Sequence, residues 1–215
     1  VIKSYAPYEK GDFFMDDVQL HKHSINRLGN ILIPNARYEL LEKKIQPILR
    51  NAYSQKKTWG ASDLIHEIGL TLKDENSFLR ACARKNVPVF SPGVIDSALG
   101  LQMYFFKQDA RDFVLDETAD FKKMSRLVFD AKKTGGIVLG GGISKHFTIG
   151  SNLLRGGLDY GVYFTTAEAY DGSLSGARTQ EAKSWGKIKE KANAITVNGD
   201  ATVFFTLAYA AAVKK

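Results

Sequence analysis

The strongest constraint on the fold is an alternation that begins at residue 87, where short runs rich in β-branched residues are separated by stretches with helical spacing. The runs typical of strands are 87–90, 113–116, 137–139, 162–164 and 194–197. Helical patterns lie near 95–106, 119–132, 145–154 and 179–185, and 201–213 comes last. Such alternation is typical of a parallel sheet covered by helices. We therefore expect an α/β fold, with a Rossmann-like parallel sheet flanked by helices on both faces and ligand sites beyond the carboxyl ends of the strands.

The first 86 residues mix irregular and helical patterns. A strand-like run at 31–34 ends at a proline, and 38–56 has apolar residues at helical spacing. We expect Ser62 to cap the next helix and Asn76 to begin another.

Composition narrows the functional classes. The net charge is +7 over 215 residues, but the basic residues are scattered without a long block, which argues against nucleic-acid binding. The longest uncharged apolar run, 201–213, is too short to span a bilayer and predicts a buried helix rather than a membrane anchor. A single cysteine, Cys82, excludes an internal disulfide and favours the cytoplasm. The pair His21 and His23 has no cluster of further ligands around it, so we expect no metal site.

A glycine turn is the first candidate binding element. The sequence GGIVLGGGISKH reads as a strand, a glycine triplet and a helix start, ending at His146. Glycines let the backbone approach a ligand closely, and a helix N-terminus offers free N–H groups to phosphate. The alternative is a tight strand-to-helix turn without a ligand. His146 is either a general acid and base or a structural histidine.

Two aspartates follow expected strands. Asp96 lies in Ser91-Pro-Gly-Val-Ile-Asp96, after the run at 87–90, and Asp200 lies in Asn-Gly-Asp-Ala-Thr after the last strand. Each is either a helix cap or a carboxylate that binds the ribose or amide of a nucleotide.

Ser184-Trp185-Gly186-Lys187 carries the most reactive candidate. Gly186 permits a tight turn that places an indole beside an ammonium. A lysine against an aromatic wall, with like charges near it, is driven toward the neutral amine that attacks carbonyls and imines. Glu181, a little earlier, is placed to bind a cationic substrate. The alternative is a solvated basic turn with a packed tryptophan. The neighbouring lysines are Lys183, Lys189 and Lys191.

Taken together, these segments resemble deoxyhypusine synthase, of an archaeal type. The ordered motifs are INRLGNILIPN, SPGVIDSALG, LGGGISKH, TTAEAYDGSLSGA, EAKSWGK and NGDAT. The resemblance implies an NAD-dependent transferase that dehydrogenates spermidine and moves its aminobutyl group onto an enzyme lysine as an imine. The group then passes to a lysine of the hypusine-bearing translation factor. The resemblance also implies a homotetramer whose sites are shared between subunits.

Roles follow from the resemblance, position by position. Lys187 matches the imine-forming lysine, and His146 matches the active-site histidine. Trp185 matches the indole that lines the polyamine channel, and Glu181 matches a carboxylate that binds an amine. The substrate loop is assigned to Asp171, Gly172 and Ser173. The cofactor contacts are assigned to Ser91, Asp96, Gly141, Gly142, Thr166, Ala167, Asp200 and Ala201.

Two departures leave alternatives open. Leu101 and Leu174 stand where eukaryotic members carry acidic residues, so two anchors for the polyamine are missing. A homospermidine synthase-like enzyme, which passes the aminobutyl group to a free diamine, is one alternative. A non-catalytic partner subunit is the other.

Residues 1–7 resemble the family just after its paired acidic segment. We therefore expect residues 1–215 to form one NAD-binding domain whose N-terminal part, with the opening strands of the sheet, lies outside this chain. Residues 1–215 by themselves are then expected to be poorly soluble and not to bind NAD.

Overall fold

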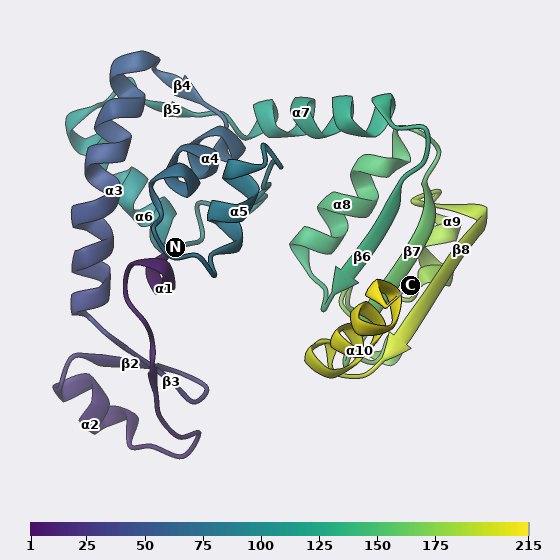
Figure 1. Ribbon diagram of the computed structural model, residues 1–215, viewed down its shortest axis with the longest axis horizontal. Helices are drawn as coiled ribbons and strands as arrows, with labels where there is room; N and C mark the ends of the chain where they lie inside the picture. Colours follow the sequence, from purple (N-terminus) through teal and green to yellow (C-terminus); the bar gives the residue numbers. More distant parts are fainter. Residues whose placement is uncertain (215) are drawn as a thin grey trace. The chain divides into compact units, whose positions relative to one another are not determined.

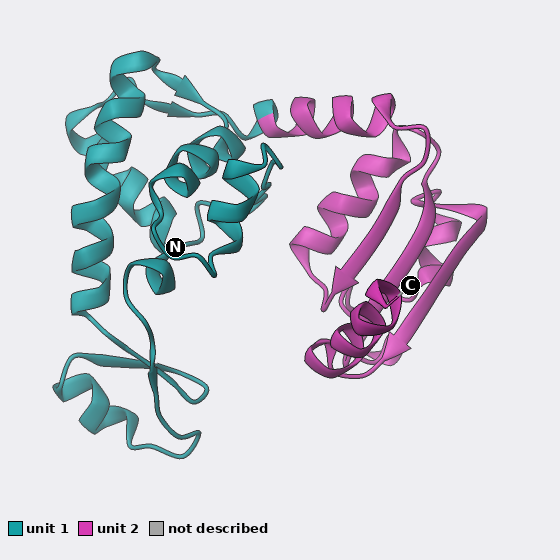
Figure 2. Cartoon of the chain, in the orientation of Figure 1, with its two compact units in different colours: residues 1–119 teal, residues 120–215 magenta. Residues whose placement is uncertain are grey.

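The computed structural model describes residues 1–214, and the chain divides into two compact units, Val1–Ala119 and Asp120–Lys215 (Figure 2). Each unit has its own cluster of buried apolar side chains. The expectation of one NAD-binding domain over residues 1–215 stays a prediction.

Unit 1, residues 1–119, packs helices around a long central one. Its core includes Leu41, Ile45 and Leu49, which share one side of α3 because they are spaced four residues apart. The two small sheets are antiparallel in the order β1-β3-β2 and parallel for β4-β5 (Figure 1). The elements are α1 (Ile2–Tyr5), β1 (Glu9–Lys10), α2 (Asp17–Lys22), β2 (Ile25–Leu28), β3 (Ile31–Pro34), α3 (Ala36–Gln55), β4 (Thr58–Trp59), α4 (Ala61–Thr71), α5 (Phe78–Arg84), α6 (Ala98–Asp109) and β5 (Val114–Leu115).

Three local predictions for unit 1 are wrong. Ser62 does not cap α4, because the helix already begins at Ala61 and Ser62 lies buried inside it. The cap of α5 is Ser77 rather than Asn76, since the Ser77 hydroxyl accepts a hydrogen bond from the Arg80 N–H at 3.4 Å. Residues 87–90 form no strand, because no described strand pairs with them and their proline lacks a backbone donor.

Unit 2, residues 120–215, is built on a parallel sheet in the order β6-β7-β8. Each predicted strand from 137 onward is present and longer than its apolar run. The elements are α7 (Glu117–Asp130, which contains the unit boundary), β6 (Gly135–Leu139), α8 (Ile143–Leu153), β7 (Leu158–Thr165), the 3-10 turn η1 (Ala169–Asp171), α9 (Thr179–Ser184), β8 (Ile188–Asn198) and α10 (Ala201–Val213).

Helices lie on both faces of this sheet. Val138 pairs with Tyr163 and Tyr163 with Thr196, so these three side chains share a face. Residues of α8 and α9 gather around Tyr163 on that face. The next residue, Phe164, points to the opposite face. There its ring meets Phe205 of α10, with centroids 6.0 Å apart. The predicted α/β class with a parallel sheet and flanking helices is therefore confirmed.

The prediction that 201–213 forms a buried helix is only half right. The helix has these bounds, but none of its residues is buried in this structure. Among the described strands it contacts chiefly β7, so much of the sheet face beside it stays exposed. Ile137 of β6 is 65% exposed and Ile195 of β8 is 58% exposed.

Candidate active site

The carboxyl ends of β6, β7 and β8 bring three predicted loops together. The Gly140 N–H donates to the Phe164 carbonyl at 2.8 Å, and the Gly199 N–H donates to the Thr165 carbonyl at 2.9 Å. Each loop therefore starts beside the end of the neighbouring strand. This edge holds six of the eight residues predicted to contact the cofactor: Gly141, Gly142, Thr166, Ala167, Asp200 and Ala201.

The glycine turn uses its three glycines in two ways. Gly140 and Gly142 have φ values of +79° and +90°, which side chains disfavour, and nothing lies within 4 Å of where a Cβ would sit. A Cβ on Gly141, by contrast, would overlap the backbone of Ser175. The first turn of α8 has no side-chain cap, so no capping side chain occupies its N–H groups. This turn fits the phosphates of a dinucleotide.

The two aspartates occupy different surroundings. Asp200 caps α10, because its carboxylate accepts a hydrogen bond from the Thr202 N–H at 2.8 Å. Its predicted contact with the cofactor stays a prediction. Asp96 and Ser91 belong to unit 1, where Asp96 is exposed and Ser91 lines an apolar cavity. Their role also stays a prediction.

Unit 2 has a cavity of about 340 Å³, and the residues predicted to be reactive line it. Lys187 Nζ lies 3.3 Å from His146 Nε2 and 4.9 Å from the centre of the Trp185 ring. Gly186, with φ +68°, makes the tight turn that sets the indole beside the ammonium, as predicted. The lining residues are Lys145, His146, Ile149, Tyr163, Leu174, Ala177, Arg178, Glu181, Ala182, Trp185 and Lys187.

The basic neighbours of Lys187 do not crowd it as the sequence suggested. Lys189 is paired with Asp159 at 2.6 Å, and Lys183 donates to the Glu190 carbonyl at 2.9 Å. The cations that share the cavity with Lys187 are Lys145, which comes from α8, and Arg178. Lys183 and Lys189 are thus engaged with other groups, and the effect predicted for Lys191 stays a prediction.

Lys145 is the largest omission of the sequence analysis. Its side chain is only 2% exposed, and its ammonium donates to the carbonyls of Leu174 and Ala177 at 2.9 and 2.6 Å. It also lies 4.4 Å from the centre of the Tyr163 ring. Burial lowers the pKa of Lys145, and the charge of Glu181 opposes that shift. The signal was its position beside His146 in LGGGISKH.

Tyr163 lines the same cavity with an unsatisfied polar group. Its side chain is fully buried, and its hydroxyl has no hydrogen-bond partner among the described residues. Burial raises the pKa of Tyr163 to about 12, so the phenol stays neutral at physiological pH. Because the hydroxyl oxygen is itself buried, its unpaired state is an energetic cost to the fold.

The predicted substrate residues divide between the cavity and the loop beside it. Glu181 lines the cavity, as does Leu174. Asp171 instead accepts a hydrogen bond from the Glu168 N–H at 3.3 Å and shapes the turn. Gly172 adopts φ +63°, and the Ser173 carbonyl accepts from the Ala177 N–H at 3.2 Å. These three residues order the loop without lining the cavity.

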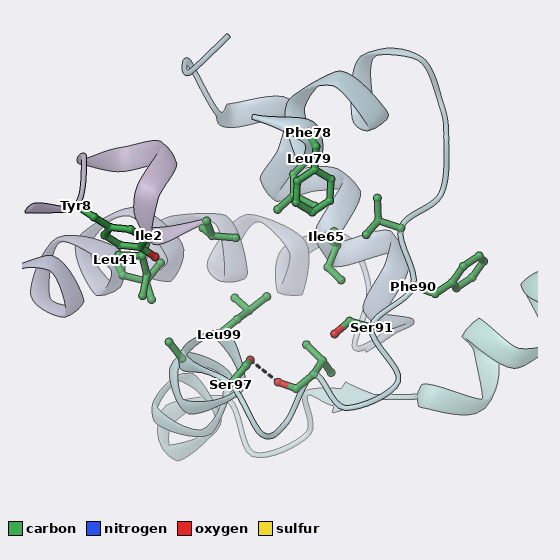
Figure 3. Close-up of a pocket in the computed structure, with 14 residues that line it drawn as sticks. Ile2, Tyr8, Leu41, Ile65, Phe78, Leu79, Phe90, Ser91, Ser97 and Leu99 are labelled. Carbon is green, nitrogen blue, oxygen red and sulfur yellow. Dashed lines mark hydrogen bonds between the residues drawn. The ribbon is translucent and has the colours of Figure 1, made fainter. Parts of the chain in front are cut away.

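Unit 1 has a cavity of its own, of about 390 Å³ (Figure 3). Apolar side chains such as Leu41, Ile65 and Leu79 form most of its wall. The Ser97 hydroxyl is turned to the Val94 carbonyl at 2.5 Å rather than to a ligand. This cavity suits an apolar ligand, whereas the cavity of unit 2 is lined by the amine of Lys187 and the imidazole of His146.

The described residues contain no cluster of three or more candidate metal ligands. No helix within residues 1–214 is long and apolar enough to cross a membrane.

Comparison with known proteins finds relatives among the archaea. A probable deoxyhypusine synthase of Thermoplasma acidophilum is 47% identical over 204 residues, which cover 94% of this chain and 66% of the relative. One from Picrophilus torridus is 43% identical over 215 residues, covering 100% of this chain and 69% of the relative. The chain thus spans about two thirds of the length of these relatives.

The fold and the family model point the same way. A solved structure of an Entamoeba histolytica protein assigned to the deoxyhypusine synthases superimposes with a TM-score of 0.62. It shares 20% identity and covers 83% of this chain and 54% of its own, so it supports the fold. The family model for deoxyhypusine synthase matches residues 1–212. The chain belongs to the deoxyhypusine synthase family.

Proposed function

We propose that the chain carries the NAD-dependent transfer of the aminobutyl group of spermidine to a lysine of the hypusine-bearing translation factor. The observation that carries the proposal is the pair formed by Lys187 and His146, 3.3 Å apart in one cavity. An amine nucleophile within reach of an imidazole is the arrangement that imine chemistry requires.

Each group has a distinct task in the proposed reaction. NAD, held at the glycine turn, supplies the hydride acceptor in the first half-reaction and the hydride donor in the second. His146 removes the proton that leaves when the C–N bond of spermidine becomes C=N. The amine of Lys187 then attacks that carbon and expels diaminopropane, which leaves the aminobutyl group on Lys187 as an imine. The amine of the acceptor lysine displaces Lys187, and reduction of the new imine completes the transfer.

The cavity also suits a polyamine. Glu181 supplies a carboxylate for a terminal ammonium, and the ring of Trp185 favours a cation near its face. A polyamine thus finds one charge partner and one aromatic wall.

The wider setting follows the family. We propose that the protein works in the cytoplasm as a homotetramer whose sites are shared between subunits. We propose no nucleic-acid or membrane partner. The remaining anchors for the polyamine then come from residues outside unit 2.

Covalent trapping tests the proposal. The full-length protein, incubated with spermidine, NAD and borohydride, should gain an aminobutyl mass on Lys187. Lys187→Arg keeps the charge but cannot form an imine, so its peptide should stay unlabelled. Lys183→Arg is the matched control and should label normally, because the Lys183 side chain is held by the Glu190 carbonyl. Label that persists in Lys187→Arg would refute the assignment.

One observation favours a second candidate function. Leu174 lines the cavity where the resemblance to eukaryotic members calls for an acidic residue. A homospermidine synthase-like enzyme, which passes the group to a free diamine, therefore remains the second candidate. Labelled spermidine should reach a lysine of the translation factor much faster than it reaches putrescine. Faster formation of free homospermidine would favour the second candidate instead.

A further inference from the structure

We propose that Lys145 is a positioning residue for this site: its buried ammonium fastens residues 174–177 to α8 and thereby holds His146 against Lys187. The inference deepens the proposed function and rests on it for the roles of His146 and Lys187. The contacts that carry it lie wholly within unit 2.

The ammonium of Lys145 is fully engaged by groups of the protein itself. An ammonium has three hydrogens to donate. Two of them reach the carbonyls of Leu174 and Ala177 at 2.9 and 2.6 Å, and the face of the Tyr163 ring lies 4.4 Å from Nζ. A lysine held in this way is a poor nucleophile, because its nitrogen is committed as a donor. Lys187, whose nearest polar neighbour is an imidazole nitrogen, is free to react.

A buried cation at this place is expensive for the fold. The side chain is 2% exposed, and no carboxylate forms an ion pair with it among the described residues. An apolar side chain of similar volume usually serves stability as well or better than a buried charge. The charge therefore points to a task beyond packing.

The position of the two carbonyls in the loop indicates that task. Leu174 and Ala177 bracket Ser175, whose backbone packs against Gly141 so closely that a Cβ there would overlap it. The Ser175 carbonyl also accepts from the Thr165 hydroxyl at 3.2 Å. The loop is thus fixed at Ser175 by the glycine turn and β7, and on either side of it by Lys145.

The same helix turn carries His146. Its N–H donates to the Gly142 carbonyl at 3.1 Å, so the imidazole moves with the start of α8. If Lys145 lost its charge, two carbonyls would lose their donors and the loop would no longer anchor this end of the helix. The 3.3 Å approach of His146 Nε2 to Lys187 Nζ would then no longer be fixed. Small displacements of reacting groups lower rates steeply.

The test uses the full-length protein and the rate of borohydride-trapped label on Lys187. Lys145→Met should lower the limiting rate by about tenfold or more while the KM for spermidine changes by less than about threefold. Lys145→Arg, which keeps a charged donor, should recover much of the loss. Lys191→Met, on the exposed part of β8, is the matched control and should behave as wild type.

Hydrogen exchange gives a readout that does not depend on activity. The Gly176 and Ala177 N–H groups both donate to the Ser173 carbonyl at 3.2 Å, so their protection reports the loop. They should exchange about tenfold or more faster in Lys145→Met and stay protected in Lys191→Met. If Lys145→Met does not fold, Lys145→Gln, which keeps a single side-chain donor group, takes its place in both assays.

The outcomes separate the two claims. Wild-type trapping rate and unchanged loop protection in a folded Lys145→Met variant would overturn the positioning role and leave the proposed function standing. Aminobutyl label found on Lys145 itself would also overturn it. If the wild type traps no label on Lys187, the proposed function fails, and loop exchange still decides whether Lys145 fastens residues 174–177.

Discussion

Tyr163→Phe should make the ligand-free protein more stable. The hydroxyl of Tyr163 is buried and has no partner among the described residues, so in the free protein it contributes only a desolvation cost. Phenylalanine removes the oxygen and keeps the ring. The ring still packs on the core and still faces the Lys145 ammonium, which lies 4.4 Å from its centre.

The size of the effect follows from the cost of an unpaired polar group. A hydroxyl buried without a hydrogen bond costs about 1–3 kcal/mol. The void left by one oxygen forfeits some dispersion contacts, which reduces the gain. We therefore expect the free energy of unfolding to rise by about 1 kcal/mol. For a chain of this length that corresponds to a rise in Tm of about 2–4 °C.

Urea unfolding followed by circular dichroism measures the change. Tyr53→Phe is the matched control, because the Tyr53 hydroxyl donates to the Asp112 carboxylate at 2.5 Å. That substitution removes a satisfied hydrogen bond and should lower stability by about 1 kcal/mol. A loss of stability in Tyr163→Phe as large as that in Tyr53→Phe would mean that the Tyr163 hydroxyl has a partner, and would refute the reasoning.

The same variant has a signature at alkaline pH. Burial raises the pKa of Tyr163 to about 12, whereas an unfolded tyrosine ionises near pH 10. A group with a raised pKa stabilises the fold fully below its unfolded pKa and loses that contribution as pH rises through the folded one. Wild type should therefore lose stability more steeply than Tyr163→Phe between about pH 10 and pH 12. Equal slopes would contradict the burial argument.

Three further predictions concern the sheet, the loop and α8. Lys189, the Thr134 N–H and Arg155 hold the pKa of Asp159 well below its usual range, so its stabilising effect is present above about pH 4 and is lost as pH falls through the folded pKa. Asp159→Asn should thus be less stable than wild type at neutral pH, and its Tm should fall less as the pH is lowered. If the Tm of both proteins fell equally with acid, the Asp159 contacts would not stabilise the fold. Gly176→Ala should destabilise the protein by about 1–3 kcal/mol, because its Cβ would overlap the Glu168 carbonyl. Gly150→Ala should instead raise stability by about 0.5–1 kcal/mol, because its Cβ would lie within α8 with His146 Cε1 at an ordinary 3.9 Å. If Gly176→Ala were the more stable of the two variants, the loop would have moved to make room for the Cβ.

The sheet of unit 2 was predictable because its strands are apolar runs bounded by turn residues. The strands at 137–139, 162–164 and 194–197 were found, and the structure extends β8 back to Ile188 through charged residues with no apolar signal. The strand expected at 87–90 is absent because an apolar run is not sufficient for a strand. A strand exists only through its hydrogen-bonded neighbour, and sequence pattern does not reveal whether a neighbour is present.

The site was predictable where turn chemistry decides the geometry. Gly186 at φ +68° and the glycine turn set Lys187 and the start of α8 as expected. Lys145 and Tyr163 escaped notice because their importance comes from burial, and burial arises only when α8 packs on β7. In sequence, Lys145 is one lysine among many, and Tyr163 is one aromatic residue in a strand.

The reaction proposed here needs a hydride acceptor and an amine nucleophile at one carbon atom, and unit 2 presents the two on different parts of its sheet. The glycine turn lies at the carboxyl edge, whereas Lys187 directly precedes β8 and its Nζ lies 3.3 Å from His146 Nε2. The link between them is the start of α8, where the Gly142 carbonyl accepts from the His146 N–H at 3.1 Å. A ligand carbon beside His146 is therefore within one helical turn of the glycine turn. This short connection explains why the cation that fastens the loop, Lys145, belongs to the same turn of helix as the imidazole.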